Sequence, residues 1–187
     1  PEQGANEPAE ELVQLRQGAD FGWPECYYDS SQKRLVLAPE YGGDGGKAIG
    51  PCAGKRAPVA AFPAHWAPND LALYQAQQFP APYRGGAFIA FHGSWNRAPA
   101  PQGGYNVVFQ PLAGGKSSAN YVVFADGFAG AKKEPGEAAH RPSGVAAGPD
   151  GSLYISDDQK GRIWRVTFHG DPKTTGITPA PSSTAVN

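Results

Sequence analysis

The 187-residue chain contains no methionine, only two cysteines and few charged side chains, which make up 18% of its residues. Its 16 lysines and arginines nearly balance its 17 aspartates and glutamates, and the net charge is −1. This balance gives no electrostatic reason to expect a nucleic-acid partner. No apolar run reaches the roughly 18 residues of a membrane span, so we expect no membrane span.

The chain also lacks a signal peptide, and its first residues, Pro1-Glu2-Gln3-Gly4, have the composition of a loop interior. We therefore expect it to be a piece of a longer protein. Several signatures of chemistry are missing as well: a Gly-x-Ser-x-Gly elbow, a phosphate-binding loop, a cysteine–histidine cluster and a Cys-x-x-Cys-His haem attachment. Their absence argues against elbow-type hydrolases, P-loop enzymes, zinc sites and attached haem.

Glycine and proline are abundant instead, with 25 and 19 residues. Together glycine and proline make up a share of the chain that approaches the level typical of disordered proteins. Many aromatic and β-branched residues lie between them, however, and short strands bounded by glycine and proline are typical of all-β proteins. We therefore predict an all-β fold.

The stretch from Arg141 to Phe168 predicts the architecture. Its apolar runs are separated by Pro149-Asp150-Gly151 and by the polar segment Asp157–Gly161. Asp-Gly between two such runs predicts a hairpin, because glycine adopts the positive φ that a tight turn needs. Three such strands form most of one blade of a β-propeller, and a blade needs neighbours to bury both of its faces. The runs are Val145–Ala147, Leu153–Ile155 and Ile163–Phe168.

Residues 57–128 predict a second set of strands, of which Ala87–Phe91 is apolar on both faces, as expected between neighbouring sheets. We predict that residues 1–169 form about two to three blades of a propeller. Residues 170–187 are rich in Pro, Thr and Ser and are expected to be a tail or linker. Because propellers close with about four to eight blades, the chain would belong to a larger ring. The other expected strands are one ending at Tyr74, Tyr105–Leu112 and Tyr121–Phe124.

The N-terminal part is less regular. Residues 7–17 fit one or two helical turns or a strand, and Trp23, in a tight turn, is expected to be a core anchor. Residues 27–56 have the composition of a long surface loop with a glycine-rich tip.

The two cysteines, Cys26 and Cys52, flank that loop. We predict a disulfide, which would stabilise the fold by about 3 kcal/mol in the chain-entropy model. It would also indicate a periplasmic or secreted protein. Two free thiols in a cytosolic protein are the alternative.

Polar clusters flank several of the predicted strands. The segment Phe91–Arg97 directly follows one strand, His65–Asn69 comes before another, and His140–Ser143 comes before a third. Equivalent positions in successive blades lie at one end of a propeller, so we expect these side chains to converge on one mouth. Arg141 is the clearest candidate for binding an anion, because a guanidinium binds a carboxylate through two parallel hydrogen bonds.

Each of these histidines could instead be structural, bonded to nearby backbone groups. The acidic pairs Asp157-Asp158 and Glu10-Glu11 are expected to be solvated surface, as adjacent carboxylates usually are.

Four segments occur in this order and together resemble those of a known family: Asp20-Phe21-Gly22-Trp23-Pro24, His65 with Ala67-Pro68, Phe91–Arg97, and Arg141–Val145 followed by Gly148–Gly151. They resemble the C-terminal half of the glucose/sorbosone dehydrogenase family, most closely its sorbosone or pyranose dehydrogenase branch. Members are six-bladed propeller enzymes that use pyrroloquinoline quinone (PQQ) and calcium. The resemblance covers nearly all of Glu2 to Phe168.

The resemblance implies that a sugar is oxidised by hydride transfer to PQQ. This quinone carries three carboxylates, which suit arginine and a divalent cation. Gln3-Gly4-Ala5 matches a family segment in which backbone carbonyls, here those of Gly4 and Ala5, bind calcium. Ala5 replaces a proline of the family, a change that backbone ligation survives. The implied cofactor contacts are His65, His92, Ser94, Asn96, Arg97 and Arg141.

The base histidine of the family lies in N-terminal blades that precede the matched region. The resemblance therefore implies that this chain holds no catalytic residue and needs the N-terminal half for turnover. It also implies a sugar substrate and an electron acceptor such as a cytochrome. Two alternatives stay open. One is a calcium-dependent propeller lactonase, with Asn69 and Asn96 as candidate ligands, and the other is a non-catalytic propeller segment that binds a partner.

Overall fold

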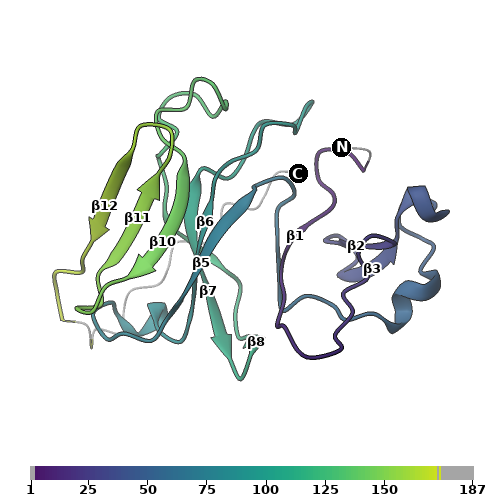
Figure 1. Cartoon of the computed structure of the whole chain (residues 1–187), viewed down its shortest axis with the longest axis horizontal. Coiled ribbons are helices and arrows are strands. Elements are labelled where there is room, and N and C mark those ends of the chain that lie inside the picture. Colours follow the sequence, from purple (N-terminus) through teal and green to yellow (C-terminus); the bar gives the residue numbers. More distant parts are fainter. Residues whose placement is uncertain (1–2, 172, 174–187) are drawn as a thin grey trace. The chain divides into compact units, whose positions relative to one another are not determined.

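A computed structural model describes residues 3–171 and 173 of the chain (Figure 1). This part of the chain is built from short strands and three single-turn or slightly longer 3₁₀ helices, with no α-helix, which confirms the all-β prediction. The chain forms two compact units. The first unit takes the chain up to Trp66 together with Trp95–Gly103, and the second takes Ala67–Ser94 and the chain from Gly104 onward.

The second unit contains the predicted strands. An antiparallel sheet runs in the order β5-β6-β7-β8. The strand β9 also pairs with β7, at Val107–Phe109, whereas β8 pairs with its last two residues. All six residues of β6 are buried, as expected of a strand that is apolar on both faces. The strands are β5 (Pro68–Tyr74), β6 (Gly86–Phe91), β7 (Asn106–Ala113), β8 (Lys116–Ser117) and β9 (Val122–Ala125).

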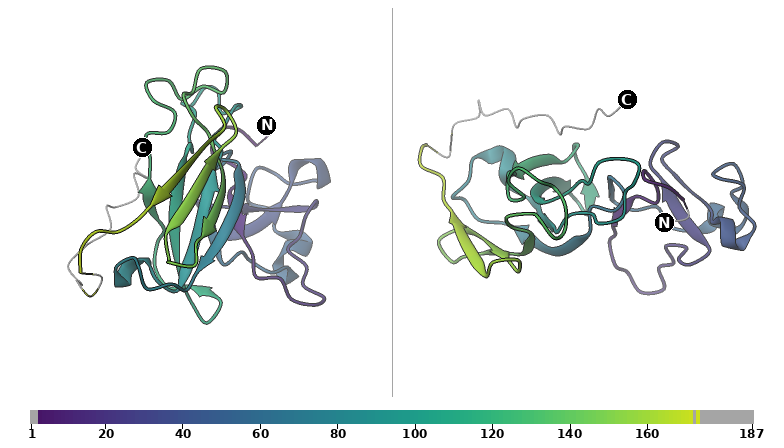
Figure 2. Two further views of the ribbon diagram at one scale, coloured as in Figure 1. Left: turned by 60° about the vertical axis from the view of Figure 1, so that its left-hand side comes forward. Right: turned by 90° about the horizontal axis from the view of Figure 1, so that it is seen from above.

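The stretch after Arg141 forms a three-stranded antiparallel meander, β10 (Pro142–Ala147), β11 (Leu153–Asp157) and β12 (Arg162–Val166). Its first hairpin turns at the predicted Asp-Gly, where Gly151 has a φ of +82°. Since an L-residue rarely adopts this φ, the turn depends on glycine. The meander lies beside β5 and β6 in the views of Figures 1 and 2.

One apolar core joins the two sheets of the second unit. Phe88 packs its ring against Phe109 and Phe124, with centroids 4.9 and 4.7 Å apart. Asp70 adds a polar link, because its Oδ2 accepts a 2.9 Å hydrogen bond from the backbone N of Val145. The buried members of this core are Tyr74, Phe79, Phe88, Ala90, Val107, Phe109, Val145, Leu153 and Ile155.

The first unit contains two small antiparallel pairs, β1 (Glu10–Leu12) with β4 (Ala60–Phe62) and β2 (Cys26–Asp29) with β3 (Arg34–Leu37). Of the two interpretations of residues 7–17, the strand is confirmed and the helix is wrong, because Glu10–Leu12 bonds to β4 rather than to itself.

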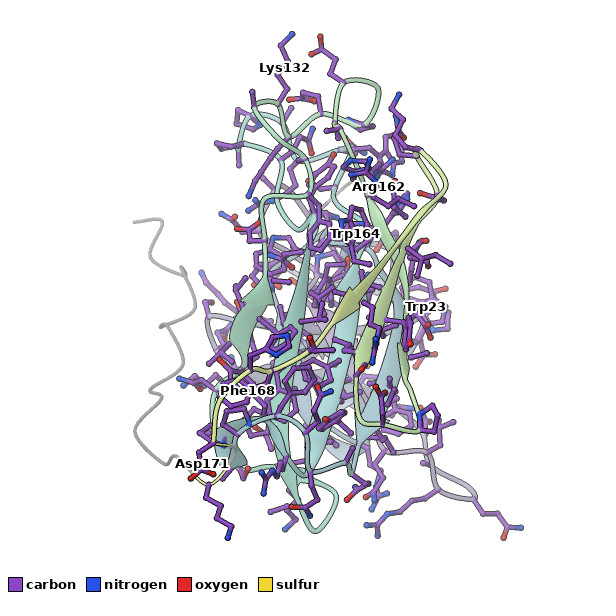
Figure 3. The ribbon with its side chains drawn as sticks, turned by 90° about the vertical axis from the view of Figure 1, so that its left-hand side faces the viewer. Trp23, Lys132, Arg162, Trp164, Phe168 and Asp171 are labelled. Atoms are coloured by element: carbon purple, nitrogen blue, oxygen red, sulfur yellow. A yellow bond between two sulfur atoms is a disulfide. The ribbon has the colours of Figure 1, made fainter. Side chains whose placement is uncertain are left out.

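Two expectations about the first unit are wrong. The segment 27–56 is not a plain surface loop, because its first part completes the β2–β3 hairpin and Val36 is fully buried. Trp23 is not a core anchor, since 82% of its surface is exposed (Figure 3). In contrast, the disulfide between Cys26 and Cys52 is confirmed, and its Cα atoms are 5.8 Å apart.

Most of the predicted tail, residues 172 and 174–187, lies outside the described residues. The division into a propeller part at 1–169 and a tail at 170–187 stays a prediction.

Candidate functional site

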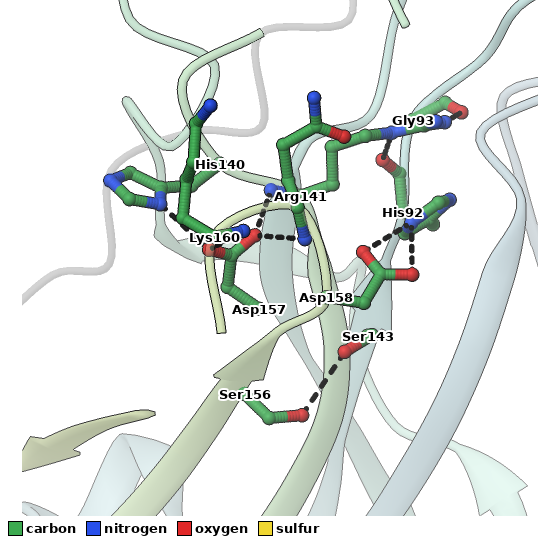
Figure 4. A network of polar contacts seen from close by, with 10 residues as sticks. His92, Gly93, His140, Arg141, Ser143, Ser156, Asp157, Asp158 and Lys160 are labelled. Atoms are coloured by element: carbon green, nitrogen blue, oxygen red, sulfur yellow. Dashed lines mark hydrogen bonds and ion pairs between the residues drawn. The ribbon is translucent and has the colours of Figure 1, made fainter. Parts of the chain in front are cut away.

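Arg141 is held by the backbone that follows β6 (Figure 4). Its Nε donates a 3.1 Å hydrogen bond to the carbonyl of His92, and its Nη2 donates a 2.8 Å hydrogen bond to the carbonyl of Gly93. The guanidinium also lies 5.4 Å from the ring centroid of Tyr105, within the range of a cation–π contact. Two carbonyls and an aromatic ring therefore fix a half-buried cation at the end of β6.

A buried carboxylate fixes the backbone of the same arginine. Asp157 ends β11 and is only 4% exposed. Its oxygens accept hydrogen bonds of 2.7 Å from the backbone N of Arg141 and 2.7 Å from Nδ1 of His140. The backbone N–H groups of Gln159 and Lys160 add two more. Burial raises the pKa of Asp157, but these hydrogen bonds outweigh it and hold the pKa below its ordinary value.

The neighbouring carboxylate orients a second histidine. Both oxygens of Asp158 lie within 3.1 Å of His92 Nε2, at 2.9 and 3.1 Å. The Asp158 side chain is 57% exposed, whereas that of His92 is 18% exposed. The prediction that Asp157-Asp158 is a solvated pair is therefore wrong for Asp157, which is enclosed and binds four donors.

The turn between β6 and β7 has a fixed backbone. Gly93 has a φ of +103°, and a Cβ placed on it would lie 2.4 Å from the Tyr105 ring. The hydroxyl of Tyr105 donates a 2.8 Å hydrogen bond to the carbonyl of Ser94, which is itself fully buried. Only glycine fits at this point, so the ring of Tyr105 can lie against the turn and hold it.

We call the residues around Arg141 the Arg141 cluster. It contains three of the predicted site residues, His92, Ser94 and Arg141, and also His140, which belongs to one of the predicted polar clusters. Three further members were not expected at a site, namely Tyr105, Asp157 and Asp158. Beside it Trp164 makes an edge contact with His140 and a cation–π contact with Arg162 (Figure 3).

A second group of predicted residues meets in the first unit, and we call it the His65 group. His65 Nε2 lies 2.9 Å from the carbonyl oxygen of Gly4. Arg97 donates through Nε to the carbonyl of Ala5 at 3.1 Å and through Nη2 to Oδ1 of Asn6 at 3.2 Å. The structure thus brings Gly4, Ala5, His65 and Arg97 together, while Asn96 is exposed.

The two groups lie in different units of the chain, so their convergence on one mouth stays a prediction. Within the described residues, no group of three or more His, Cys, Asp or Glu side chains is placed to hold a metal ion. Among the same residues, no helix is long and apolar enough to cross a membrane.

The residues present fit an anionic cofactor. The Nη1 of Arg141 makes no hydrogen bond with another described residue, which leaves a donor for a ligand carboxylate. For calcium, the carbonyl oxygens of Gly4 and Ala5 each have a second lone pair beside the one used by His65 or Arg97. Backbone carbonyls are among the ligands that calcium takes, so these two oxygens suit the ion.

Antiparallel sheets packed over a shared aromatic core place the chain in the all-β class. More specifically, the chain belongs to the TrAA12-like family, whose model matches residues 4–169.

Solved structures share the fold. The chain has a TM-score of 0.64 and 21% identity with a Trichoderma reesei protein of carbohydrate-active enzymes family AA12. With the PQQ domain of pyranose dehydrogenase from Coprinopsis cinerea, solved in its holo form, the TM-score is 0.61 and the identity 22%. The alignments cover 85% and 88% of this chain but only 43% and 45% of the two structures.

An uncharacterized protein of Borreliella burgdorferi is 34% identical to this chain over 108 residues, which are 57% of this chain and 27% of that protein. The chain therefore spans less than half of the length of the relatives that it matches.

Proposed function

We propose that the chain is part of a PQQ- and calcium-dependent sugar dehydrogenase of the sorbosone or pyranose type. Its family and its fold support a sugar oxidoreductase of the propeller class. In this proposal the β5–β9 sheet is one blade, the β10–β12 meander is most of the next, and the first unit contributes part of a third.

The residues of this chain bind and orient the cofactor, whose quinone, when bound, accepts the hydride of the sugar. Arg141, whose Nη1 is not used by another described residue, would hold a carboxylate of the quinone, and His92 and Ser94 would lie beside it. In the first unit His65, Asn96 and Arg97 would provide further contacts, and the carbonyls of Gly4 and Ala5 would bind calcium.

The way the fold holds Arg141 through hydrogen bonds is the observation that supports this proposal most. Three of its donors are fixed by the fold, through the backbone N, Nε and Nη2, and the guanidinium is half-buried rather than solvated. A cation held in this way loses little conformational entropy when it binds a carboxylate.

The whole reaction needs parts beyond this chain. We propose that the base histidine lies in N-terminal blades and that turnover requires them. A cytochrome or another acceptor would then reoxidise the quinone. The disulfide favours an oxidising compartment, and we propose a periplasmic or secreted location.

Titration of the chain with PQQ in the presence of calcium tests the proposal. We expect a shift of the quinone absorbance and a rise in the melting temperature, because a ligand that binds only the folded state stabilises it. Arg141→Ala should weaken binding about tenfold or more, which corresponds to the loss of a charged hydrogen bond. Arg162→Ala, which removes an exposed cation on β12, is the matched control.

Two results would contradict the proposal. Hydrolysis of a lactone without the quinone would indicate the propeller lactonase. No response to either the quinone or a lactone would indicate a binding segment without catalysis.

A further inference from the structure

A surface pocket of about 350 Å³ in the first unit is lined by two arginines, Arg16 and Arg56. Pockets that bind small molecules usually measure about 300–1,000 Å³. Asp20 and the glycines Gly18 and Gly54 complete much of the wall. No residue of the His65 group lines the pocket, and the proposed function gives it no role.

The two arginines leave the pocket with positive charge. Asp20, the acid in the wall, is already bound, because Lys55 donates to its Oδ2 at 2.6 Å and the backbone N of Gly22 to its Oδ1 at 2.8 Å. These two hydrogen bonds, the one from Lys55 first, hold the pKa of Asp20 below its ordinary value. The negative charge of Asp20 is therefore balanced by Lys55 and leaves Arg16 and Arg56 uncompensated.

The hydrogen bonds of the arginines themselves confirm this imbalance. Arg16 donates through Nε and Nη2 to the neutral amide oxygen of Gln14, at 3.1 and 2.7 Å. The side chain of Arg56 makes no hydrogen bond or ion pair with any residue in the described part of the chain. Two guanidinium groups without an acidic partner around one pocket are suited to an anion with two oxygens, such as a carboxylate.

The loop that forms one wall of the pocket is held rigidly. The backbone N of Arg56 donates to the carbonyl of Asp20 at 2.8 Å, and that of Cys26 donates to the carbonyl of Gly22 at 2.8 Å. Gly22 has a φ of +93°, and a Cβ on it would lie 2.7 Å from Cβ of Cys26. The loop is thus packed onto the disulfide to Cys52.

This rigid loop presents Trp23 to solvent with 82% of its surface exposed. A large flat ring on a fixed loop offers a contact surface at little cost in conformational entropy. Trp23 follows Asp20 by three residues, so at most about 10 Å of chain separates them. A ligand of one or two sugar rings can span this distance.

We propose that the pocket and Trp23 form a binding site for a carboxylated sugar, such as a uronic acid at the end of a saccharide. The carboxylate binds Arg16 and Arg56, and the C–H face of the sugar ring packs on the indole of Trp23. This site goes beyond the proposed function, since it assigns a saccharide class to residues that the cofactor does not use.

Titration of the chain with D-glucuronate, followed by calorimetry without any quinone, tests the site. We expect binding that weakens as salt is added, and weakens about tenfold in Arg56→Ala, in line with the loss of charged hydrogen bonds. Lys47→Ala removes another exposed cation of the first unit and should leave binding unchanged. No binding of glucuronate, or equal binding by Arg56→Ala, would overturn the proposal.

Two further ligands and one variant separate the sugar from the charge. D-Glucose, which lacks the carboxylate, should bind far more weakly than glucuronate, and inorganic phosphate should bind more weakly as well. Trp23→Ala should weaken glucuronate binding, whereas Tyr41→Ala, which removes another exposed aromatic ring of the same unit, should not. If phosphate binds as tightly as glucuronate and Trp23→Ala changes neither, the pocket is a plain anion site and the sugar assignment is wrong.

These titrations contain no quinone, so their outcome and that of the PQQ titration are independent. The variants at Arg16, Trp23 and Arg56 should retain the response to PQQ.

Discussion

The carboxylate of Asp157 accepts a 2.7 Å hydrogen bond from the backbone N of Arg141, sixteen residues earlier in the chain. The same carboxylate binds the ring of His140, the residue before that arginine. One buried acid thus fixes the peptide that carries the guanidinium, and the guanidinium in turn reaches the carbonyls of His92 and Gly93. The strength of anion binding by Arg141 should therefore depend on a residue that does not itself touch the anion.

We predict that Asp157→Asn lowers the free energy of unfolding by about 1–3 kcal/mol, because a buried carboxylate with four donors cannot be replaced by an amide without unsatisfied groups. It should also weaken the PQQ binding that we propose for Arg141. Asp158→Asn is the matched control. It alters a partly exposed hydrogen bond to His92, which should cost about 1 kcal/mol or less. Urea unfolding of both variants measures the difference, and equal losses would show that Asp157 has no special role.

We predict that Gly93→Ala destabilises the fold more than a positive φ alone explains. A methyl group there would be strained and would also meet the ring of Tyr105, at a combined cost of about 2–5 kcal/mol. Gly127→Ala is the control, because Gly127 has a φ of +83° but open space around its Cβ. That variant should cost only about 1 kcal/mol. Similar melting temperatures for the two variants would contradict the contact with Tyr105.

Glu7 predicts a pH dependence of stability in the first unit. Burial raises the pKa of Glu7 to about 7, and its Oε2 is buried without a hydrogen-bond partner among the described residues. The folded state therefore favours the protonated form. Stability from this group is fully present below its ordinary value of 4.5 and is lost as pH rises to about 7.

Glu7→Gln should consequently be more stable than the parent chain at pH 8 and similar to it at pH 4. Thermal unfolding across this range measures the effect. Glu134→Gln, which changes an exposed carboxylate, should give parallel curves with the parent. A Glu7→Gln variant whose stability falls with pH as the parent's does would contradict the assignment.

Removing the disulfide by replacing Cys26 and Cys52 with serine should lower stability by about 3 kcal/mol, because the unfolded chain regains the freedom of the closed loop. Since the disulfide also supports the Gly22–Trp23 loop, we expect glucuronate binding to weaken while the Arg141 cluster keeps its response to PQQ. Calorimetric titration of the serine variant and of the parent chain, with glucuronate and with PQQ in turn, provides the comparison.

The strands after Arg141 could be predicted from sequence because glycine, proline and aspartate bound each apolar run, and turn chemistry acts locally. The β2–β3 hairpin was missed because its strands are only four residues long and contain two tyrosines, an aspartate and an arginine beside the apolar positions. The disulfide was predictable because the two cysteines have no cysteine–histidine cluster around them, which leaves a disulfide or two free thiols.

The residues next to Asp157 in the sequence do not show that it is buried, because two of its hydrogen-bond donors belong to His140 and Arg141, sixteen or more residues away. The sequence signal was its position at the end of the apolar run that forms β11, much as His92 directly follows β6. The prediction that Trp23 is a core anchor was wrong because a tight turn determines the backbone but not the direction of the side chain.

The hydrogen bond between Asp70 and Val145 has a consequence for how such a protein can grow by duplication. Apolar packing between neighbouring sheets tolerates sliding, whereas a carboxylate reaching one particular amide sets a single alignment. A second bond, from the Tyr74 hydroxyl to the carbonyl of Gly151, ties the opposite end of the same strand. A duplicated pair of sheets would keep this alignment only if both anchoring residues, Asp70 and Tyr74, were copied with it. Insertions in the loops outside β5 would leave the two bonds in place.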